Sequence, residues 1–312
     1  MANELTHALL QTNGGQVASV LSGLLVDQLY DATDLRSLMT FVPAEFIGSD
    51  TVDVTQDANP TAFAAATNET TGGQSNTAYT TSKFSLTIAR YVLQYQITDL
   101  LGGLTADPVG FAQVVRKIDQ GVGRTMTDLV ATLFGSLSNT VGTTTVDLVV
   151  NDIYLADFQL NTQNAGTNTG QKACVLYNEQ MNNFRQSLRS ETGAQQFVPS
   201  TAAMLETMGP GMQGTWNGIQ FWQSDSVPTA NAGADSAGAL FVPGCFAYTL
   251  GNASQIVQAG MVDPADIILD AGAVIIERNR DATNGMSELI GNLYPSVVEA
   301  EDGRGVAIIT DR

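Results

Sequence analysis

The sequence predicts an α+β fold in which extended segments are arranged around one long helix. Residues 84–97 alternate apolar and polar side chains, which is typical of a half-buried strand. Between Phe111 and Leu133 apolar side chains recur every three or four residues, which is typical of an amphipathic helix. Beyond Gly142, short strand-like and helix-like runs mix without an internal repeat. Strands before a long helix and a mixed remainder after it together indicate the α+β class.

The first 98 residues predict an arm followed by a long hairpin. Residues 1–40 carry apolar side chains at mixed helical spacings interrupted by glycines, so we expect short helices there. Residues 41–54 are predicted to be extended, whereas residues 55–81 are rich in Thr, Asn, Gly and Ala and cannot hold a core of their own. The return strand changes its apolar face at Ala89-Arg90, where we expect a bulge or a change of packing surface. A hairpin with such a core-poor tip is expected to pack against a neighbouring copy in an oligomer.

One helix dominates the middle of the chain. Asp107 and Pro108 provide an N-cap and a proline at the first helical position, and the apolar stripe runs from there to about Leu137. At about 1.5 Å per residue such a helix is on the order of 45 Å long. Gly121 and Gly123 weaken its middle and predict a bend or a close crossing of another element.

The remaining elements follow from shorter periodic runs. We expect strands at 145–150, 173–177, 218–223, 238–242 and 273–280, helices at 152–163 and 178–190, and a terminal pair of strands at 296–299 and 305–310 joined by the turn 301–303.

The charge balance disfavours several classes of protein. The chain has 312 residues with 31 acidic and 13 basic side chains, which gives a formal net charge of −18. A field of that sign repels phosphate, so a protein that reads DNA or RNA sequence is disfavoured. His7 is the only histidine, which leaves almost no material for Ser-His-Asp or Cys-His relays or for a histidine-rich metal site.

Cysteine spacing and hydropathy bear on the cellular compartment. Cys174 and Cys245 form no C-x-x-C pair, and we expect both to be small core residues. The most apolar N-terminal run, Val20 to Val26, is shorter than the roughly 18 residues of a spanning helix. We therefore expect a cytoplasmic protein with no membrane partner.

Several side chains could in principle take part in catalysis or binding, but structural roles explain them better. They comprise the carboxylate pairs Glu299 with Glu301 and Asp263 with Asp266, the turn residues Asp281, Asn284 and Gly285, and the aromatic residues Trp216, Phe221 and Trp222. Chance spacing explains the pairs in so acidic a chain, the turn lacks the alternating ligands and final glutamate of an EF-hand, and strand aromatics are typical of a core or an interface. The sequence therefore predicts no enzyme and no catalytic, cofactor-binding or metal-binding residue.

Three stretches carry a resemblance to a known family. Residues 90–101, from Arg90-Tyr91 to Leu100-Leu101, lead into the helix that ends near Phe134-Gly135. This stretch is similar to the hairpin return strand and spine helix of the major capsid protein of tailed bacteriophages, which has the Hong Kong 97 fold. Residues 218–228 resemble the glycine-to-proline strand of that family's axial domain. Residues 277–282, Ile290-Gly291 and 305–310 are similar to its peripheral-domain sheet.

The resemblance implies a division of the chain into five parts. These are an N-terminal arm at 1–40, an extended β-hairpin loop at 41–98, a peripheral domain with the spine helix at 99–150, an axial domain at 151–270, and the C-terminal strands of the peripheral domain at 271–312.

The implied function is structural. Such a protein self-assembles as hexamers and pentamers into the icosahedral head around the double-stranded DNA of a tailed phage, and it is found in the virion after assembly in the host cytoplasm. Its expected partners are other copies of itself, scaffolding and portal proteins, a cement or decoration protein, and packaged DNA held without sequence preference. Two alternatives stay open: an encapsulin-type shell around cargo enzymes, and a secreted surface-layer or adhesin protein.

Two charge features follow from this reading. Residues 1–80 contain nine acids against Arg36 alone, either as a solvated face or as a lumenal surface that repels the packaged genome. The nine are Glu4, Asp27, Asp31, Asp34, Glu45, Asp50, Asp53, Asp57 and Glu69. Some relatives join a loop lysine to an asparagine of a neighbour, but Lys83, Lys117 and Lys172 are all poorly placed for this, so we expect shells without covalent links.

Overall fold

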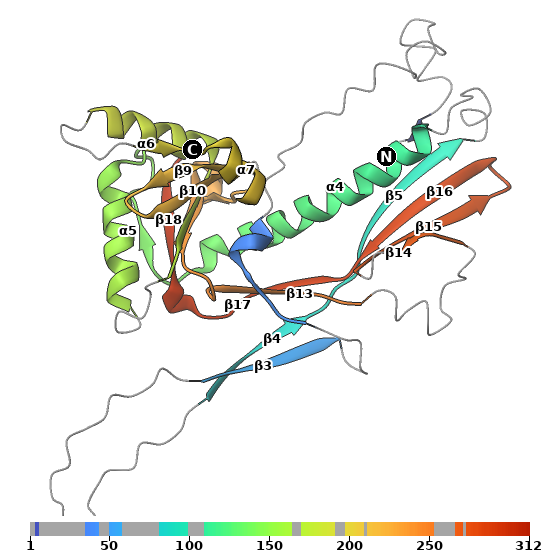
Figure 1. Ribbon diagram of the computed structural model, residues 1–312, viewed down its shortest axis with the longest axis horizontal. Coiled ribbons are helices and arrows are strands. Elements are labelled where there is room, and N and C mark those ends of the chain that lie inside the picture. The colour runs from blue at the N-terminus through green and yellow to red at the C-terminus, as the bar shows by residue number, and fades with distance from the viewer. Residues whose placement is uncertain are drawn as a thin grey trace, which may run out of the picture.

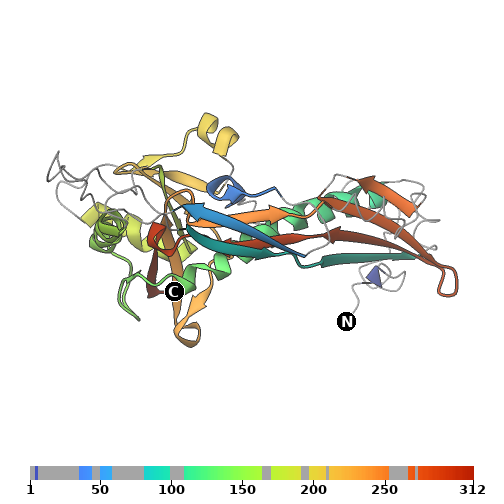
Figure 2. The same ribbon diagram turned by 90° about the horizontal axis from the view of Figure 1, so that it is seen from below.

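The chain is elongated, with a head at one end and a thin sheet at the other (Figure 1). The computed structural model describes residues 4–5, 35–43, 50–57, 81–98, 109–163, 170–190, 197–208, 211–252, 266–270 and 273–312. Helix α4 (Val109–Thr132) runs between the two ends and connects them. Figure 2 shows long strands following the same direction alongside it.

The head is built on an eight-stranded sheet, called here the head sheet. Its order is β6 (Thr140–Val141), β18 (Gly305–Asp311), β12 (Asp235–Phe241), β7 (Lys172–Leu176), β10 (Ile219–Gln223), β9 (Met212–Trp216) and β8 (Val198–Pro199), with β11 (Thr229–Ala230) added to β12. Helices α5 (Val150–Thr162), α6 (Asn178–Ser190) and α7 (Ala202–Met208) belong to the same end of the molecule.

The head sheet is buried on both faces, which explains why its strands are apolar at consecutive positions. In β7, Ala173 and Val175 join a core that includes the C-terminal half of α4, whereas Cys174 and Leu176 join the core beneath α5 and α6. The same alternation divides β12, β10 and β18 between the two cores.

The thin end is a five-stranded sheet, called here the distal sheet. Its order is β1 (Glu4–Leu5), β5 (Tyr91–Thr98), β16 (Met286–Leu293), β15 (Val274–Asp281) and β14 (Ile267–Asp270). Helix α4 packs on one face through Ile118, which meets Ile276 and Leu289. A Cβ at Gly291 would lie 2.4 Å from the Ile118 side chain, so this close approach requires glycine.

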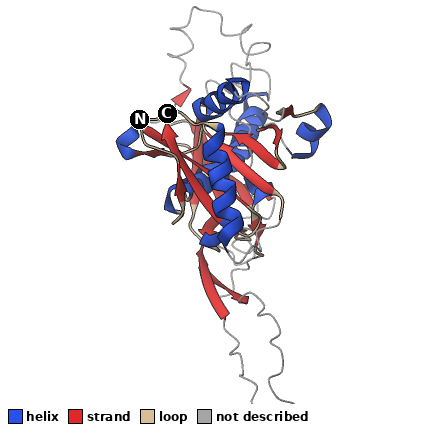
Figure 3. Cartoon of the chain, turned by 90° about the vertical axis from the view of Figure 1, so that its left-hand side faces the viewer, coloured by secondary structure: helices blue, strands red, loops and turns tan. Residues whose placement is uncertain are grey.

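The chain also forms two smaller sheets. β17 (Pro295–Glu299) pairs with β13 (Phe246–Leu250), which also pairs with β2 (Thr40–Phe41). β3 (Thr51–Asp57) and β4 (Thr81–Thr87) form a two-stranded ribbon that projects from the body when the chain is viewed from the head end (Figure 3). Short 3-10 turns lie at η1 (Leu35–Leu38), η2 (Phe134–Ser136), η4 (Asn231–Gly233) and η6 (Asp302–Arg304).

Most of the predicted elements are confirmed. Helix α6 has the predicted bounds, α5 begins two residues early, and the strands β7, β10, β12 and β15 lie where the periodicity placed them. The predicted change of packing surface at Ala89-Arg90 is confirmed, because β4 pairs with β3 whereas β5 joins the distal sheet. Gly121 lies where a Cβ would be 2.9 Å from Leu93, so the predicted close crossing is confirmed there, whereas a Cβ at Gly123 would meet nothing.

Three predictions are wrong. The helix ends at Thr132, so its 24 residues span about 36 Å, and the apolar stripe continues only through the turn η2. Residues 145–150 are not a strand, because Thr145 has a φ of +60° and Val149 caps α5. The last two strands do not pair with each other: β17 pairs with β13, and β18 lies in the head sheet between β12 and β6 and not in the distal sheet.

Within the predicted arm, Leu35–Leu38 form the short 3-10 turn η1, as expected, whereas Glu4–Leu5 form the strand β1 and not a helix. The rest of the arm, the hairpin tip at 58–80, and the cap at Asp107 and Pro108 lie outside the described residues.

Candidate assembly surfaces

The β3–β4 ribbon has one apolar and one polar face. Its register places Val52 opposite Leu86 and Val54 opposite Phe84, and these four side chains share a face. Leu86 is fully buried, so this face packs against the body of its own subunit. The other face presents threonine, serine, aspartate and lysine side chains to solvent.

Polar contacts fix the ribbon at both of its ends. The Ala89 amide donates to the Pro295 carbonyl oxygen at 3.3 Å, and Gln56 Nε2 donates to Glu301 Oε2 at 2.9 Å. The described half of the hairpin is therefore held by its own chain. The expectation that the whole hairpin depends on neighbours is corrected by this finding, and only the tip at 58–80 stays a candidate for it.

Lys83 lies on the polar face of the ribbon. Its Nζ is 2.5 Å from Asp53 Oδ2, and Ser85 Oγ donates to the other oxygen of the same carboxylate at 2.5 Å. The hydrogen bonds from Lys83 and then from Ser85 lower the pKa of Asp53. Both charged side chains are more than half exposed, so Lys83 is a solvated charge beside a strand.

The carboxylates near the tip end of the described ribbon surround the turn η6. Burial raises the pKa of Glu299, and the neighbouring Asp302 raises it further, against a hydrogen bond from Ser136 that lowers it. Glu301 pairs with Arg304 while it accepts the bond from Gln56. Glu299 and Glu301 therefore hold a junction together, whereas Asp266 is exposed and Asp263 lies outside the described residues.

The face of the distal sheet opposite α4 is a polar network. Arg90 donates to Asn292 Oδ1 at 2.9 and 2.7 Å, and Asn292 Nδ2 donates to Glu277 Oε1 at 2.7 Å. Gln96 Nε2 donates to Glu288 Oε1 at 2.7 Å along the same sheet. On this face Asn292 is 1% exposed, whereas Gln96, Glu277 and Glu288 are half-buried, so the network is partly covered within the chain itself.

Helix α5 carries apolar side chains on two sides. Ile153, Ala156 and Leu160 are buried against the head sheet, whereas Leu155 is 45% exposed and Phe158 is 65% exposed. An α-helix with apolar side chains on two opposite sides is typical of an element that is covered on both.

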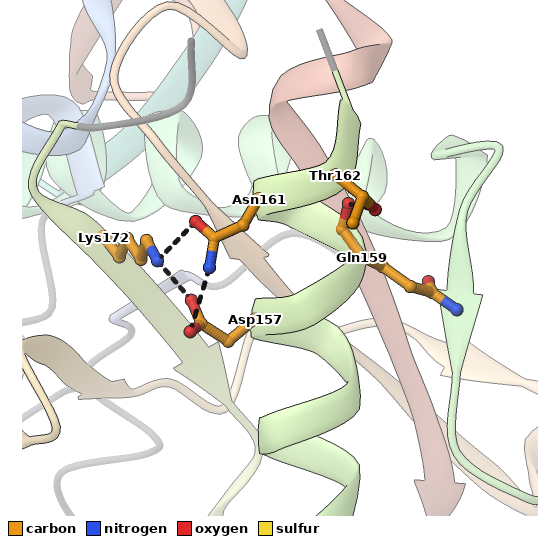
Figure 4. A network of polar contacts seen from close by, with 5 residues as sticks. All are labelled: Asp157, Gln159, Asn161, Thr162 and Lys172. Atoms are coloured by element: carbon orange, nitrogen blue, oxygen red, sulfur yellow. Dashed lines mark hydrogen bonds and ion pairs between the residues drawn. The ribbon is translucent and has the colours of Figure 1, made fainter. Parts of the chain in front are cut away.

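Polar contacts hold α5 on the head sheet, as Figure 4 shows. Lys172, the first residue of β7, forms an ion pair with Asp157 and donates to Asn161 Oδ1 at 2.8 Å. Asn161 Nδ2 also donates to Asp157 Oδ2 at 3.2 Å. Asp157 and Asn161 are four residues apart and therefore reach β7 from one side of the helix.

The remaining candidates from the sequence have structural roles. Trp216, Phe221 and Trp222 are buried in the head, and Phe221 stacks on Phe184 with ring centroids 4.7 Å apart. Cys174 and Cys245 are buried, as predicted, and burial raises the pKa of both thiols.

The turn after β15 is a surface turn, as predicted. The Asp281 carboxylate accepts hydrogen bonds from Asn284 Nδ2 at 2.6 Å and from the Thr283 and Asn284 amides. These bonds, first the one from the Asn284 side chain, lower the pKa of Asp281.

Within the described part of the chain, no three His, Cys, Asp or Glu side chains are grouped as metal ligands would be. None of the helices described there combines the length and apolar character that a membrane span requires. His7 lies outside the described residues.

The fold is that of several solved virus heads. No family model and no curated protein sequence matches the chain. The head structure of Helicobacter pylori bacteriophage KHP40 is similar with a TM-score of 0.63 and 7% identity, over 96% of this chain and 99% of that one. The capsid of cyanophage P-SCSP1u has a TM-score of 0.59 and 12% identity, over 93% of this chain and 92% of that one.

An encapsulin has the same fold. The holo-SrpI encapsulin complex from Synechococcus elongatus is similar with a TM-score of 0.63 and 13% identity, over 92% of this chain and 91% of that one. The α+β capsid fold that the sequence predicts, with its likeness to the Hong Kong 97 type, is thus confirmed over nearly the whole chain.

Proposed function

We propose that this chain is the major capsid protein of a tailed phage, a structural protein that assembles into the icosahedral head around the viral DNA. The observation that carries the proposal is the capsid fold over more than nine-tenths of the chain. The ribbon supports it, because a β-hairpin anchored at its base leads into a tip whose sequence has no core of its own. The function is building a shell and not catalysis.

The proposal includes the division of the chain into N-terminal arm, extended loop, peripheral domain and axial domain. It also includes hexamers and pentamers as the assembling species, with scaffolding, portal and cement proteins as partners. The protein would be found in the virion, after assembly in the host cytoplasm. The acidic side chains of the N-terminal arm would then line the lumen and repel packaged DNA.

A shell around cargo enzymes is the second candidate function, because the encapsulin complex is as similar in fold as the KHP40 head. A surface-layer or adhesin protein has no support from these fold comparisons.

Electron microscopy of the purified chain tests the proposal. Express the chain alone, concentrate it over a range of salt concentrations, and image it in negative stain. Closed shells or rings of five and six copies support shell building, whereas monomers under every condition or flat arrays would contradict it. Shells that copurify with a folded enzyme in their lumen would favour the encapsulin reading over the phage reading.

A further inference from the structure

Helix α5 lies at the far end of the head (Figure 1), and its outer face is apolar. Five of the eleven exposed large apolar side chains in the described residues lie between 146 and 158, so the exposed apolar surface is concentrated there. Three of them, Tyr154, Leu155 and Phe158, are on the helix itself and are each at least 45% exposed. Phe158 follows Leu155 by three residues and Tyr154 by four, which places the three side chains next to one another opposite the buried face.

The neighbouring helix α6 has a polar outer face, unlike α5. Both helices pack on the same core of the head sheet, α5 through Ile153 and α6 through Phe184. The exposed positions of α6 are all polar: Asn178, Glu179, Asn182, Gln186, Arg189 and Ser190. Two neighbouring helices with the same buried role therefore have opposite outer faces, and only the α6 face suits water.

The outer face of α5 is also neutral, although the chain has a net charge of −18. The acids near it are turned aside and engaged within the chain. Asp147 accepts from Asn183 at 3.0 Å, Asp152 caps the Val149 amide at 3.1 Å, and Asp157 pairs with Lys172. Two strongly acidic copies repel each other least where neither presents a carboxylate, so this face is suited to contact with a second copy.

The face is held in place before any partner arrives. The ion pair of Lys172 with Asp157 anchors the second half of the helix, and Ser187 Oγ on α6 accepts from the Val150 amide at 3.2 Å at its start. Tyr154 packs edge to face on Trp216 with ring centroids 4.9 Å apart. A rigid surface loses little conformational freedom on binding, which favours association.

We propose that the outer face of α5, formed by Tyr154, Leu155 and Phe158, is the surface through which the head contacts the head of a neighbouring copy. This inference rests on the proposed function, since a shell requires copies to meet, and it assigns the meeting point to named residues. The elongated subunits would converge at their head ends, and each contact would bury the Phe158 ring.

Charged and apolar substitutions at Phe158 test the inference. Phe158→Glu and Phe158→Lys each place a charge where the contact requires an apolar ring, whereas Phe158→Leu keeps an apolar side chain. Asn182→Glu adds the same carboxylate to the outer face of α6 and serves as the matched control. Assembly is measured by sedimentation and negative-stain microscopy across a concentration series, and folding is measured by circular dichroism and thermal unfolding.

We expect all four variants to fold like the unaltered chain, because both positions are exposed. The Glu and Lys variants should require at least about tenfold more protein for assembly, or fail to assemble, whereas Phe158→Leu and Asn182→Glu should assemble within about threefold of the unaltered chain. Normal assembly of either charged variant would overturn the inference. Failure of the unaltered chain to associate at all would instead count against the proposed function.

Discussion

The head sheet and the distal sheet differ in how many of their faces are covered and in how many apolar side chains they bury. The head sheet is covered on both faces, and the core beneath α5 and α6 alone contains seventeen fully or nearly buried apolar residues. The distal sheet is covered by α4 on one face, where the corresponding cluster in the described residues contains Ile118, Ile276 and Leu289. The head therefore has the means to be stable without neighbouring copies, whereas the described residues of the distal end form a much smaller apolar cluster.

Because of this difference, neighbouring copies in an assembly are expected to contribute more to the stability of the distal end than to that of the head cores. In the distal strand β5, Val92 is 50% exposed on the face of the polar network, whereas Tyr91 and Leu93 are 39% and 37% exposed on the face toward α4. Contacts between copies can add burial along β5 at this end, whereas in the head, whose cores are already closed, they can add it at the outer face of α5. Substitutions can therefore distinguish regions that are stable in the isolated subunit from regions that need neighbouring copies.

The largest effect is expected from removing the hairpin tip. The register pairs Asp57 with Thr81, so residues 58–80 can be replaced by Asn-Gly, which closes a two-residue hairpin turn without disturbing the ribbon. The subunit should fold and unfold like the unaltered chain, because Leu86 and the Gln56 contact with Glu301 are kept. Shells should be absent in electron micrographs, and shells of normal size in this variant would show that the tip is dispensable.

A large loss of stability is expected from Phe184→Ala in the head. Phe184 is fully buried, stacks on Phe221 and meets Trp216 edge to face at 5.5 Å between centroids. Truncation of such a ring leaves a cavity and should lower the free energy of unfolding by about 3–5 kcal/mol, measured by chemical denaturation of the unassembled subunit. A loss below about 1 kcal/mol would mean that the head does not dominate the stability of the chain.

A smaller and local loss is expected from Ile118→Ala in the distal end. Ile118 is 2% exposed and fills the space above Gly291. The global unfolding midpoint should hardly change, whereas amide hydrogen exchange should accelerate in β5, β15 and β16 alone. Assembly into shells should restore protection in those strands. Equal acceleration throughout the head would contradict the separation of the two regions.

The sequence predicted elements well where their signal is local. Helix α6 was placed to the residue, because a polar outer face and the buried positions Met181 and Phe184 follow the helical period. Pairing was less predictable, since the partners of β17 and β18 lie about fifty or more residues away and nothing in a strand's own pattern identifies them. The strands β13 and β16 were not predicted, and Gly291 in β16 resembles a break until its packing under Ile118 is known.

The candidate surfaces were only half predictable. The exposed character of Lys83 and the core-poor tip follow from composition, whereas the anchoring of the ribbon by Leu86 depends on which face meets the body. The outer face of α5 had a signal in the sequence, because Leu155 and Phe158 interrupt the polar side of the predicted helix 152–163. That signal acquires meaning only when the structure shows that the opposite side is already the buried one.

The smallest effect concerns pH at the junction between the two regions. The pKa of Glu299 is raised above 4.5, first by burial and then by the proximity of Asp302. A carboxyl group with a raised pKa in the folded state stabilises that state at low pH, and this contribution is lost as the pH rises from the unfolded value through the folded one. The free energy of unfolding of the unaltered chain should therefore fall relative to Glu299→Gln between about pH 4 and neutrality, because the glutamine stays uncharged.

Asp302→Asn removes the neighbouring charge that helps to raise the pKa of Glu299, so it should shrink the same pH-dependent difference. The measurement is a series of denaturation curves at fixed salt from pH 4 to pH 7.5, and parallel curves for the unaltered chain and Glu299→Gln would place the pH sensitivity of the fold elsewhere than at this turn.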